Sequence, residues 1–254
     1  MGGALAYAAS KVLSADRIAV SDLDPARVEP FVREKKATAA ELAEVVRESR
    51  YIFLAVKPQG LAGLFDQISG ILKKRQDHFV LVSMAAGVPI ERIAQLAGME
   101  CPIIRMMPNT PVRVGQGMIL YAANDKASGE DVEGYLNGLS GAGKFDAIPE
   151  KLIDAAGALS GCGPAFVYLF AEALADGGVW CGLPRDKANL YAAQTLAGAA
   201  ELLLSSGTHP GALKDAVCSP GGTTIEGVRT LENGAFRGTV TNAVVSAYEK
   251  TKKL

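Results

Sequence analysis

Tyr51-Ile-Phe-Leu-Ala-Val-Lys-Pro-Gln59 is a nearly continuous apolar run that ends at a lysine and a proline. Phe79-Val-Leu-Val-Ser83 is a second run of this kind, and the segment Leu61–Lys74 between the two has helical spacing. Short strands that are apolar at nearly every position are buried on both faces, as in a parallel sheet covered by helices on both sides. These segments predict an α/β fold with a doubly wound parallel sheet.

The same alternation extends outward from Arg17 to about Ile148. Asp24-Pro25 supports one helix boundary directly, because Asp is a good N-cap and Pro suits the first helical turn. Further strands are predicted at Arg17–Ser21, Ile103–Met107 and Gly117–Tyr121, and further helices at Pro25–Lys36, Ala39–Glu48 and Ile90–Gly98.

Past about Pro149 the pattern becomes helical, with no convincing strand. Tyr191-Ala-Ala-Gln-Thr-Leu-Ala-Gly-Ala-Ala200 is Ala-rich almost all round, and such a helix needs burial on most faces. About 100 residues bury only part of that surface alone, so we expect an interlocked dimer. The predicted helices are Pro164–Gly182, Asp186–Ser206, Gly211–Cys218, Thr224–Glu232 and Phe236–Lys252.

Composition narrows the classes of partner. The formal net charge of the 254 residues is −1, which disfavours a nucleic-acid binder or a polybasic membrane binder. No apolar run approaches the roughly 20 residues of a membrane span, and no signal peptide is evident at the start. The four cysteines form no C-x-x-C pair and the two histidines lie far apart, so neither a disulfide framework nor a metal site is predicted. We expect a cytoplasmic enzyme acting on a small molecule.

Several motifs follow predicted strands, where doubly wound sheets bind ligands. Gly2-Gly3 opens an apolar helix, and Ser21-Asp22 ends the next strand about 20 residues later, which fits the second half of a dinucleotide-binding βαβ unit. A flexible start followed by an ordinary helix is the alternative. Polar side chains and prolines also stand at two further strand ends, in Ala55-Val-Lys-Pro-Gln59 and Met106-Met-Pro-Asn-Thr-Pro111. The alternative is that the prolines have a purely structural role in ending the strands.

Cys218-Ser-Pro-Gly-Gly-Thr-Thr224 is the most informative segment for function. Its Pro and Gly residues predict a tight turn that opens a helix, whose free N–H groups favour an anion. The hydroxyls of Ser219, Thr223 and Thr224 add donors, so the segment suits a carboxylate; a helix cap with nothing bound explains it equally well. Leu159-Ser-Gly-Cys-Gly-Pro-Ala165 is a second Gly-rich turn, which either lets a flat cofactor ring approach or fits a tight bend between domains.

Other polar residues are weaker candidates. Glu172 and Asp176 lie one turn apart on a mostly apolar helix, where an N-cap or backbone hydrogen-bonding role is a better interpretation than catalysis. His209 precedes a proline in a predicted loop, where a surface or capping role is the better interpretation. No G-x-S-x-G elbow, H-E-x-x-H pair or Walker lysine loop is present, which disfavours the commonest hydrolases and phosphoryl transferases.

These motifs together resemble the pyrroline-5-carboxylate reductase family along essentially the whole chain. The segment from Leu213 to Thr224 overlaps the family signature, which continues to Glu232. The matching runs are Met1-Gly-Gly-Ala, Ala55-Val-Lys-Pro-Gln59, Met107-Pro-Asn-Thr-Pro111, Leu159-Ser-Gly-Cys-Gly-Pro-Ala165, Ala173-Leu-Ala-Asp-Gly-Gly178, Gly182-Leu-Pro184, His209-Pro210 and Leu213-Lys-Asp-Ala-Val-Cys-Ser-Pro-Gly-Gly-Thr-Thr224.

The resemblance implies a Rossmann-like dinucleotide-binding domain over residues 1–150 and a helical substrate and dimerisation domain over residues 151–254. It implies NAD(P)H-dependent reduction of 1-pyrroline-5-carboxylate to L-proline, in a homodimer or a higher oligomer of dimers. It assigns the substrate carboxylate to Ser219, Gly221, Gly222, Thr223 and Thr224, with Thr224 and Ser219 as the catalytic side chains. It assigns the cofactor to Gly2, Ser21, Ala55, Lys57, Pro58 and Asn109, and no metal.

The choice between NADPH and NADH stays open. Asp22 and Asp24 favour NADH by repelling a 2′-phosphate, whereas Ser21 and Arg27 favour NADPH. Family members begin with a strand leading into G-x-G-x-M-G, and this sequence starts at the Met of that motif. We therefore expect the chain as written to lack the first strand and phosphate loop, to bind NAD(P)H poorly, and to gain binding from a preceding segment of about ten residues that ends in Gly-x-Gly-x.

Two rival functions stay open from the sequence. One is a related dehydrogenase acting on another small cyclic imine or carboxylate, although a helical-domain lysine of the kind such enzymes use is not evident here. The other is a catalytically silent dimeric protein that binds carboxylates. The reason to consider it is the missing phosphate loop.

Overall fold

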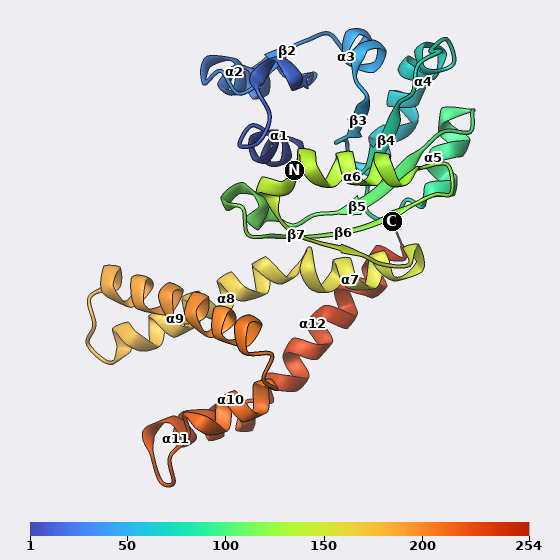
Figure 1. The fold of residues 1–254 in the computed structure, drawn as a ribbon. Helices are drawn as coiled ribbons and strands as arrows, with labels where there is room; N and C mark the ends of the chain where they lie inside the picture. The colour runs from blue at the N-terminus through green and yellow to red at the C-terminus, as the bar shows by residue number, and fades with distance from the viewer. Residues whose placement is uncertain (254) are drawn as a thin grey trace. The chain divides into compact units, whose positions relative to one another are not determined.

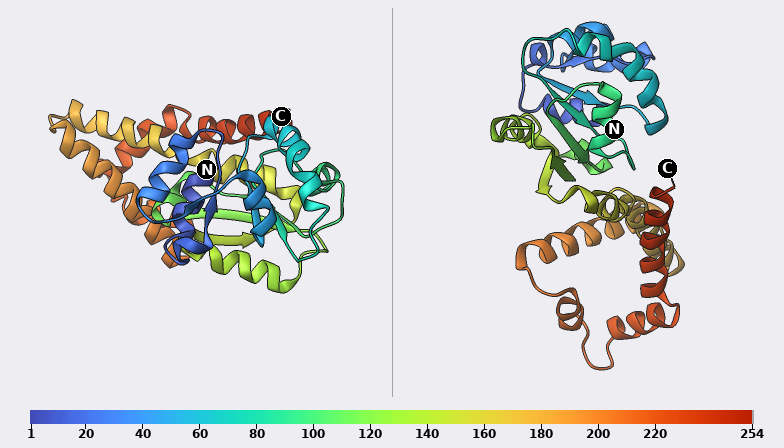
Figure 2. Two further views of the ribbon diagram at one scale, coloured as in Figure 1. Left: turned by 90° about the horizontal axis from the view of Figure 1, so that it is seen from above. Right: turned by 90° about the vertical axis from the view of Figure 1, so that its right-hand side faces the viewer.

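The structure is a computed structural model that describes residues 1–253, and it divides into two compact units. The first comprises Met1–Cys162 together with the end of the chain from Ala247, and the second comprises Gly163–Ser246. Figure 1 shows strands in the first unit, and Figure 2 shows the second as a set of helices joined by short loops. The domain boundary after residue 150 stays a prediction; residues 151–162 pack with the first unit.

The first unit holds a five-stranded sheet in the order β3-β4-β5-β6-β7 and a separate parallel pair, β1-β2. Within the large sheet, β3-β4, β4-β5 and β6-β7 are parallel and β5-β6 is antiparallel. The strands are β1 (Ala19–Val20), β2 (Thr38–Ala39), β3 (Tyr51–Leu54), β4 (Val80–Ser83), β5 (Ile103–Met107), β6 (Gly117–Ala123) and β7 (Gly143–Ala147).

Helices cover both faces of the large sheet, as the apolar strands predict. On one face Leu81 and Ile103 pack with side chains of α4 and α5; on the other, Val82 and Ile104 pack with side chains of α1 and α6. The helices of this unit are α1 (Gly2–Ala9), α2 (Pro25–Arg33), α3 (Leu42–Glu48), α4 (Leu61–Leu72), α5 (Ile90–Ala97), α6 (Gly129–Gly138) and α7 (Ile153–Ser160).

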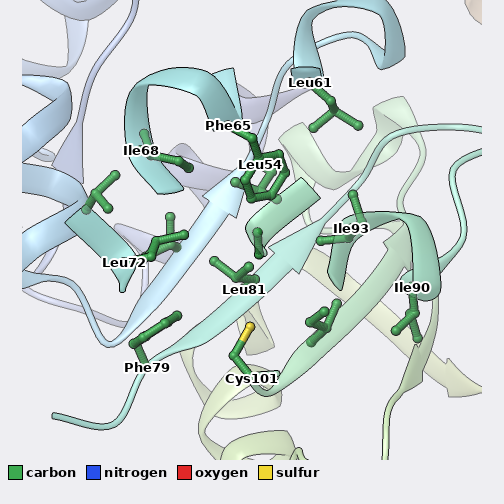
Figure 3. Close-up of a cluster of buried hydrophobic side chains, with 14 of the residues drawn as sticks. Leu54, Leu61, Phe65, Ile68, Leu72, Phe79, Leu81, Ile90, Ile93 and Cys101 are labelled. Atoms are coloured by element: carbon green, nitrogen blue, oxygen red, sulfur yellow. The ribbon is translucent and has the colours of Figure 1, made fainter. Parts of the chain in front are cut away.

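The core on the α4 face is formed by tightly buried aliphatic and aromatic side chains (Figure 3). Phe65, Ile68 and Leu72 recur along α4 at helical spacing, and each is at most 2% exposed. They meet Leu54 and Leu81 of neighbouring strands, which are equally buried. Cys101 borders this cluster, and burial raises the pKa of its thiol to about 11. A thiol of this kind behaves as a small apolar side chain.

The second unit consists of helices over its described length, as the sequence predicts. α8 and α9 pack against each other around Ala175, Ala188 and Ala192. Their remaining apolar side chains are largely exposed; Tyr168 and Leu169 of α8, for example, are 64% and 69% exposed. The helices are α8 (Gly163–Trp180), α9 (Arg185–Ser206), α10 (Pro210–Ala216), α11 (Thr223–Asn233) and α12 (Phe236–Thr251).

The structure corrects the expected sheet at one strand pair. β6 runs antiparallel to β5, because residues 108–116 are too few for the parallel crossover, which takes about a dozen residues or more. β6 and β7 are again parallel, since α6 lies between them in the chain.

Other differences concern short or polar elements. β2 occupies the start of the helix predicted from Ala39, so α3 begins at Leu42. The structure also contains β7, α6 and α7, which the sequence analysis left without an element.

Glu150–Trp180 is the one stretch among residues 1–253 that is long and apolar enough to cross a membrane. It is divided, since α7 ends at Ser160 and α8 begins at Gly163. Across the same described residues no group of three His, Cys, Asp or Glu side chains is placed to hold a metal ion. That the chain contacts no membrane and binds no metal stays a prediction.

Candidate functional site

The carboxyl ends of β3, β4 and β5 lie next to one another, because these strands are parallel neighbours. Ala55 follows β3 and Asn109 lies just beyond β5, so two expected cofactor residues share this edge of the sheet. The turn Met84–Gly87 after β4 lies between them, with Gly87 at a φ of 72°. No cofactor role was assigned to this turn from the sequence, although Gly87 shortly after an apolar strand signals a turn there.

Gly2 brings the start of α1 against this edge. A Cβ atom added to Gly2 would lie 2.7 Å from the Cβ of Ala55, well inside ordinary contact distance. Only glycine therefore lets the helix start approach β3 this closely. The free N–H groups at a helix start attract anions, and a glycine at such a start admits a pyrophosphate. The structure thus brings together two residues that the sequence predicts for the cofactor.

Lys57 and Pro58 continue from Ala55 into a short 3₁₀ turn. The backbone carbonyl of Lys57 accepts from the N–H of Gly60 at 2.8 Å, which fixes the local backbone. The Lys57 side chain is exposed and has no acidic partner among the residues that the structure describes. It is thus available for an anionic ligand.

Ser21 follows β1 in a loop whose acidic side chains already have partners. Asp22 Oδ1 accepts from the N–H of Asp24 at 3.0 Å, and Asp24 Oδ1 accepts from the N–H of Ala26 at 3.1 Å. Asp24 Oδ2 also lies 3.5 Å from Arg27 Nε. Asp24 therefore caps α2 as the sequence predicts, while the loop keeps both acidic and basic groups and leaves the cofactor preference open.

Asn109 differs from the other cofactor residues because it is buried, at 8% exposure. Its Nδ2 donates to the carbonyl of Ser160 at 3.0 Å, and its Oδ1 accepts from the N–H of Met118 at 3.0 Å. Both halves of the amide are thus engaged within the chain.

The turn Cys218–Thr224 in the second unit has the form that the sequence predicts. Gly221 has a φ of 65°, and the N–H of Gly222 donates to the carbonyl of Ser219 at 3.0 Å, closing a tight turn. A Cβ on Gly222 would lie 2.2 Å from Ser219 Oγ, so the hydroxyl packs directly over this glycine.

α11 begins at Thr223, and no side chain caps its first N–H groups. Ser219, Gly221, Thr223 and Thr224 are all exposed, so hydroxyl and backbone donors are open at this helix start. Such a start attracts an anion. We call the segment 218–224 the substrate turn, after the role that the sequence predicts for it.

A nearby acidic group is already paired. Glu226, in the first turn of α11, accepts from Arg229 Nε at 3.1 Å. This hydrogen bond lowers the pKa of the Glu226 carboxyl. The arginine offsets a negative charge that would oppose an anion at the helix start.

Two of the three weaker candidates have structural roles. His209 Nδ1 accepts from the N–H of Gly211 at 3.1 Å and caps α10, which confirms the capping interpretation. Asp176 accepts from Arg185 at 2.5 Å and links α8 to α9. Glu172 lines a hollow of about 580 Å³ on these two helices.

Two family models match the chain. Residues 150–254 match a family described as pyrroline-5-carboxylate reductase dimerisation. Residues 1–87 match a family described as NADP oxidoreductase, coenzyme F420-dependent.

Several known proteins are similar over most or all of the chain. A pyrroline-5-carboxylate reductase of Pisum sativum is 42% identical over 100% of this chain and 92% of its own length. Another, of Glycine max, is 46% identical over 83% of this chain and 76% of its own. The crystal structure of a Plasmodium falciparum pyrroline carboxylate reductase with NADP bound has a TM-score of 0.86 and 32% identity, covering 100% of this chain and 94% of that one.

Proposed function

This chain belongs to the pyrroline-5-carboxylate reductase family, and on that premise we propose how its residues reduce 1-pyrroline-5-carboxylate to L-proline with NAD(P)H. The observation that carries the proposal for the substrate is the start of α11. It offers uncapped N–H groups beside exposed hydroxyls, and this substrate has one carboxylate to fill such a place.

The cofactor lies at the carboxyl edge of β3, β4 and β5 in the first unit. Gly2 and Ala55 admit the pyrophosphate to the start of α1, and their close approach supports this assignment. Lys57 and Pro58 shape the next turn, with the exposed ammonium of Lys57 near the anionic part of the cofactor. Ser21 meets the adenosine ribose after β1. Asn109 belongs to the same edge.

NAD(P)H supplies a hydride when bound. The substrate as an iminium accepts that hydride at the carbon of its C=N bond, and the electron pair of the π bond moves to nitrogen, which keeps its proton. The product is the secondary amine of proline. No side chain has to form a covalent bond, so the protein contributes orientation and a suitable electrostatic environment.

The substrate turn holds the carboxylate. The N–H groups of Thr223 and Thr224 and the Thr224 hydroxyl donate to its oxygens, and Ser219 adds a second hydroxyl. Gly221 and Gly222 keep the turn tight enough for these donors to converge. Thr224 and Ser219 are therefore the side chains to which we assign catalysis, through fixing the substrate and not through proton transfer.

The active protein is a homodimer or an oligomer of dimers in the cytoplasm. Exposed apolar side chains on α8 and α9 support the dimer; Leu202 and Leu204 of α9 are 56% and 62% exposed. The family model that matches residues 150–254 is described by dimerisation. We retain 1–150 and 151–254 as the cofactor and the substrate and dimerisation domains.

The test is consumption of NAD(P)H with 1-pyrroline-5-carboxylate against a panel of hydroxy acids and other cyclic imines. We expect pyrroline-5-carboxylate to give the highest kcat/KM. Another substrate that exceeds it by two orders of magnitude would overturn the substrate assignment. Calorimetric titration with L-proline and with NAD(P)H tests the alternative of a catalytically silent carboxylate binder. Such a protein would release heat on binding L-proline and none on addition of NAD(P)H.

A further inference from the structure

α7 lies along β5 through three contacts that repeat in register. Arg105 of β5 donates to Asp154 of α7 at 2.5 Å, and a Cβ on Gly157 would lie 2.9 Å from Met107 Cγ. The third contact is the hydrogen bond from Asn109 Nδ2 to the carbonyl of Ser160. Alternate residues of an extended strand share a side, and every third residue of a helix recurs on one face, so 105, 107 and 109 meet 154, 157 and 160 in order.

The Asn109 contact holds the last residue of α7. A C-terminal helix carbonyl has no partner within its own helix, and Asn109 supplies the missing donor for Ser160. The chain then passes through Gly161 and Cys162 to Gly163, the first residue of α8.

Little of the same amide is open to an outside ligand. Oδ1 accepts from Met118 at the start of β6, Nδ2 donates one of its two N–H groups to Ser160, and the residue is only 8% exposed. We propose that Asn109 is a positioning residue, which ties the end of β5 to the end of α7 and so holds the cofactor edge of the sheet in the geometry that hydride transfer requires, without binding NAD(P)H. The inference rests on the proposed function and refines the assignment of Asn109 to the cofactor.

A matched control lies at the opposite end of β5. Asn124 Oδ1 accepts from the N–H of Ile103 at 3.0 Å, and its Nδ2 donates to the carbonyl of Cys101 at 2.9 Å. Asn124 is thus a second asparagine clamp with at least as many internal hydrogen bonds, at the amino end of the strand. Asn124→Ala therefore measures how much stability is lost when an asparagine with such internal hydrogen bonds is removed away from the cofactor edge.

The experiment compares Asn109→Ala and Asn109→Asp with Asn124→Ala and the unmodified chain. Asn109→Asp keeps an acceptor for Met118 and loses the donor to Ser160, so it isolates the α7 contact if the alanine variant folds poorly. The measurements are Kd for NAD(P)H by fluorescence, kcat with both substrates saturating, and the primary isotope effect with cofactor deuterated at the transferred hydrogen.

For both Asn109 variants we expect kcat to fall about 10–100-fold with a larger isotope effect, since a displacement near 1 Å is sufficient for such losses. We expect Kd for NAD(P)H to change less than about 3-fold, and Asn124→Ala to keep kcat while losing thermal stability. A raised Kd with kcat retained would identify Asn109 as a cofactor ligand and overturn the inference. Equal kcat in the Asn109 and Asn124 variants would overturn it as well, whereas absence of turnover in the unmodified chain would refute the proposed function instead.

Discussion

Replacing Gly2 by alanine is the sharpest test of the cofactor edge. The new Cβ would lie 2.7 Å from Ala55 Cβ, whereas two carbon atoms rest at about 3.5–4.0 Å, so the start of α1 has to move by about 1 Å. Overpacking of this kind costs ~1–3 kcal/mol. Because the shift carries the helix N–H groups away from the pyrophosphate, we expect Kd for NAD(P)H to rise about 5–150-fold.

The assay is fluorescence titration of NAD(P)H. A second substitution, at Ala55, should rescue the Gly2→Ala variant. Ala55→Gly removes the atom that the new Cβ meets, so Gly2→Ala combined with Ala55→Gly should recover most of the affinity of the Ala55→Gly background. Gly70→Ala is the control, since a Cβ there meets nothing within 4 Å. The reasoning fails if Gly2→Ala leaves Kd unchanged, or if the double variant binds no better than Gly2→Ala.

Three further outcomes follow from the structure. Thr224→Ala should raise KM for pyrroline-5-carboxylate about 10–150-fold with little change in cofactor Kd, because it removes a hydrogen bond to a charged group; Thr230→Ala on the same helix is the control, and an unchanged KM would dismiss the assignment. Burial raises the pKa of the Asp131 carboxyl, but hydrogen bonds from Ser128 and His78 together lower that pKa by more than burial raises it. The pKa of Asp131 therefore lies below the ordinary value. Asp131→Asn should therefore cost about 1.5–3 kcal/mol in urea unfolding above pH ~5, and this difference should shrink as pH falls below the unfolded value of ~3.9 and through the lower folded value; a difference that grows in acid would contradict the assignment. Sedimentation at micromolar concentration should show a dimer or larger, and a fully active monomer would refute the proposed assembly.

Strongly apolar elements could be predicted from the sequence almost to the residue. β5 has the predicted bounds, and α4 and α5 end within two residues of their predicted ends. β7 was missed because Gly143-Lys-Phe-Asp-Ala147 is a partly exposed strand with a weak apolar pattern. α6 was missed although Ser128 and Asp131 form a capping box, a signal that the sequence does contain.

The candidate site could be predicted as a set of positions and less well as a set of contacts. Parallel topology places residues after neighbouring strands at one edge, so Ala55 and Asn109 could be assigned there from strand pattern alone. The approach of Gly2 to Ala55 depends on where α1 packs, and nothing in the local sequence around either residue specifies it. A glycine at a helix start indicates only that some close approach is allowed.

Arg105 and Asn109 show why a polar residue in or after a strand does not by itself indicate a ligand. Arg105 is 2% exposed within an apolar strand, and a buried charge requires a partner of opposite charge. Its partners Glu150 and Asp154 come from a segment that the sequence analysis left without an element. Once that segment folds into a short 3₁₀ turn and α7, the charge of Arg105 is paired with two carboxylates, and the amide of Asn109 has a partner in the carbonyl of Ser160. A polar side chain at a sheet edge is therefore free for a ligand only when the helix packed beside it supplies no partner, and that depends on tertiary packing.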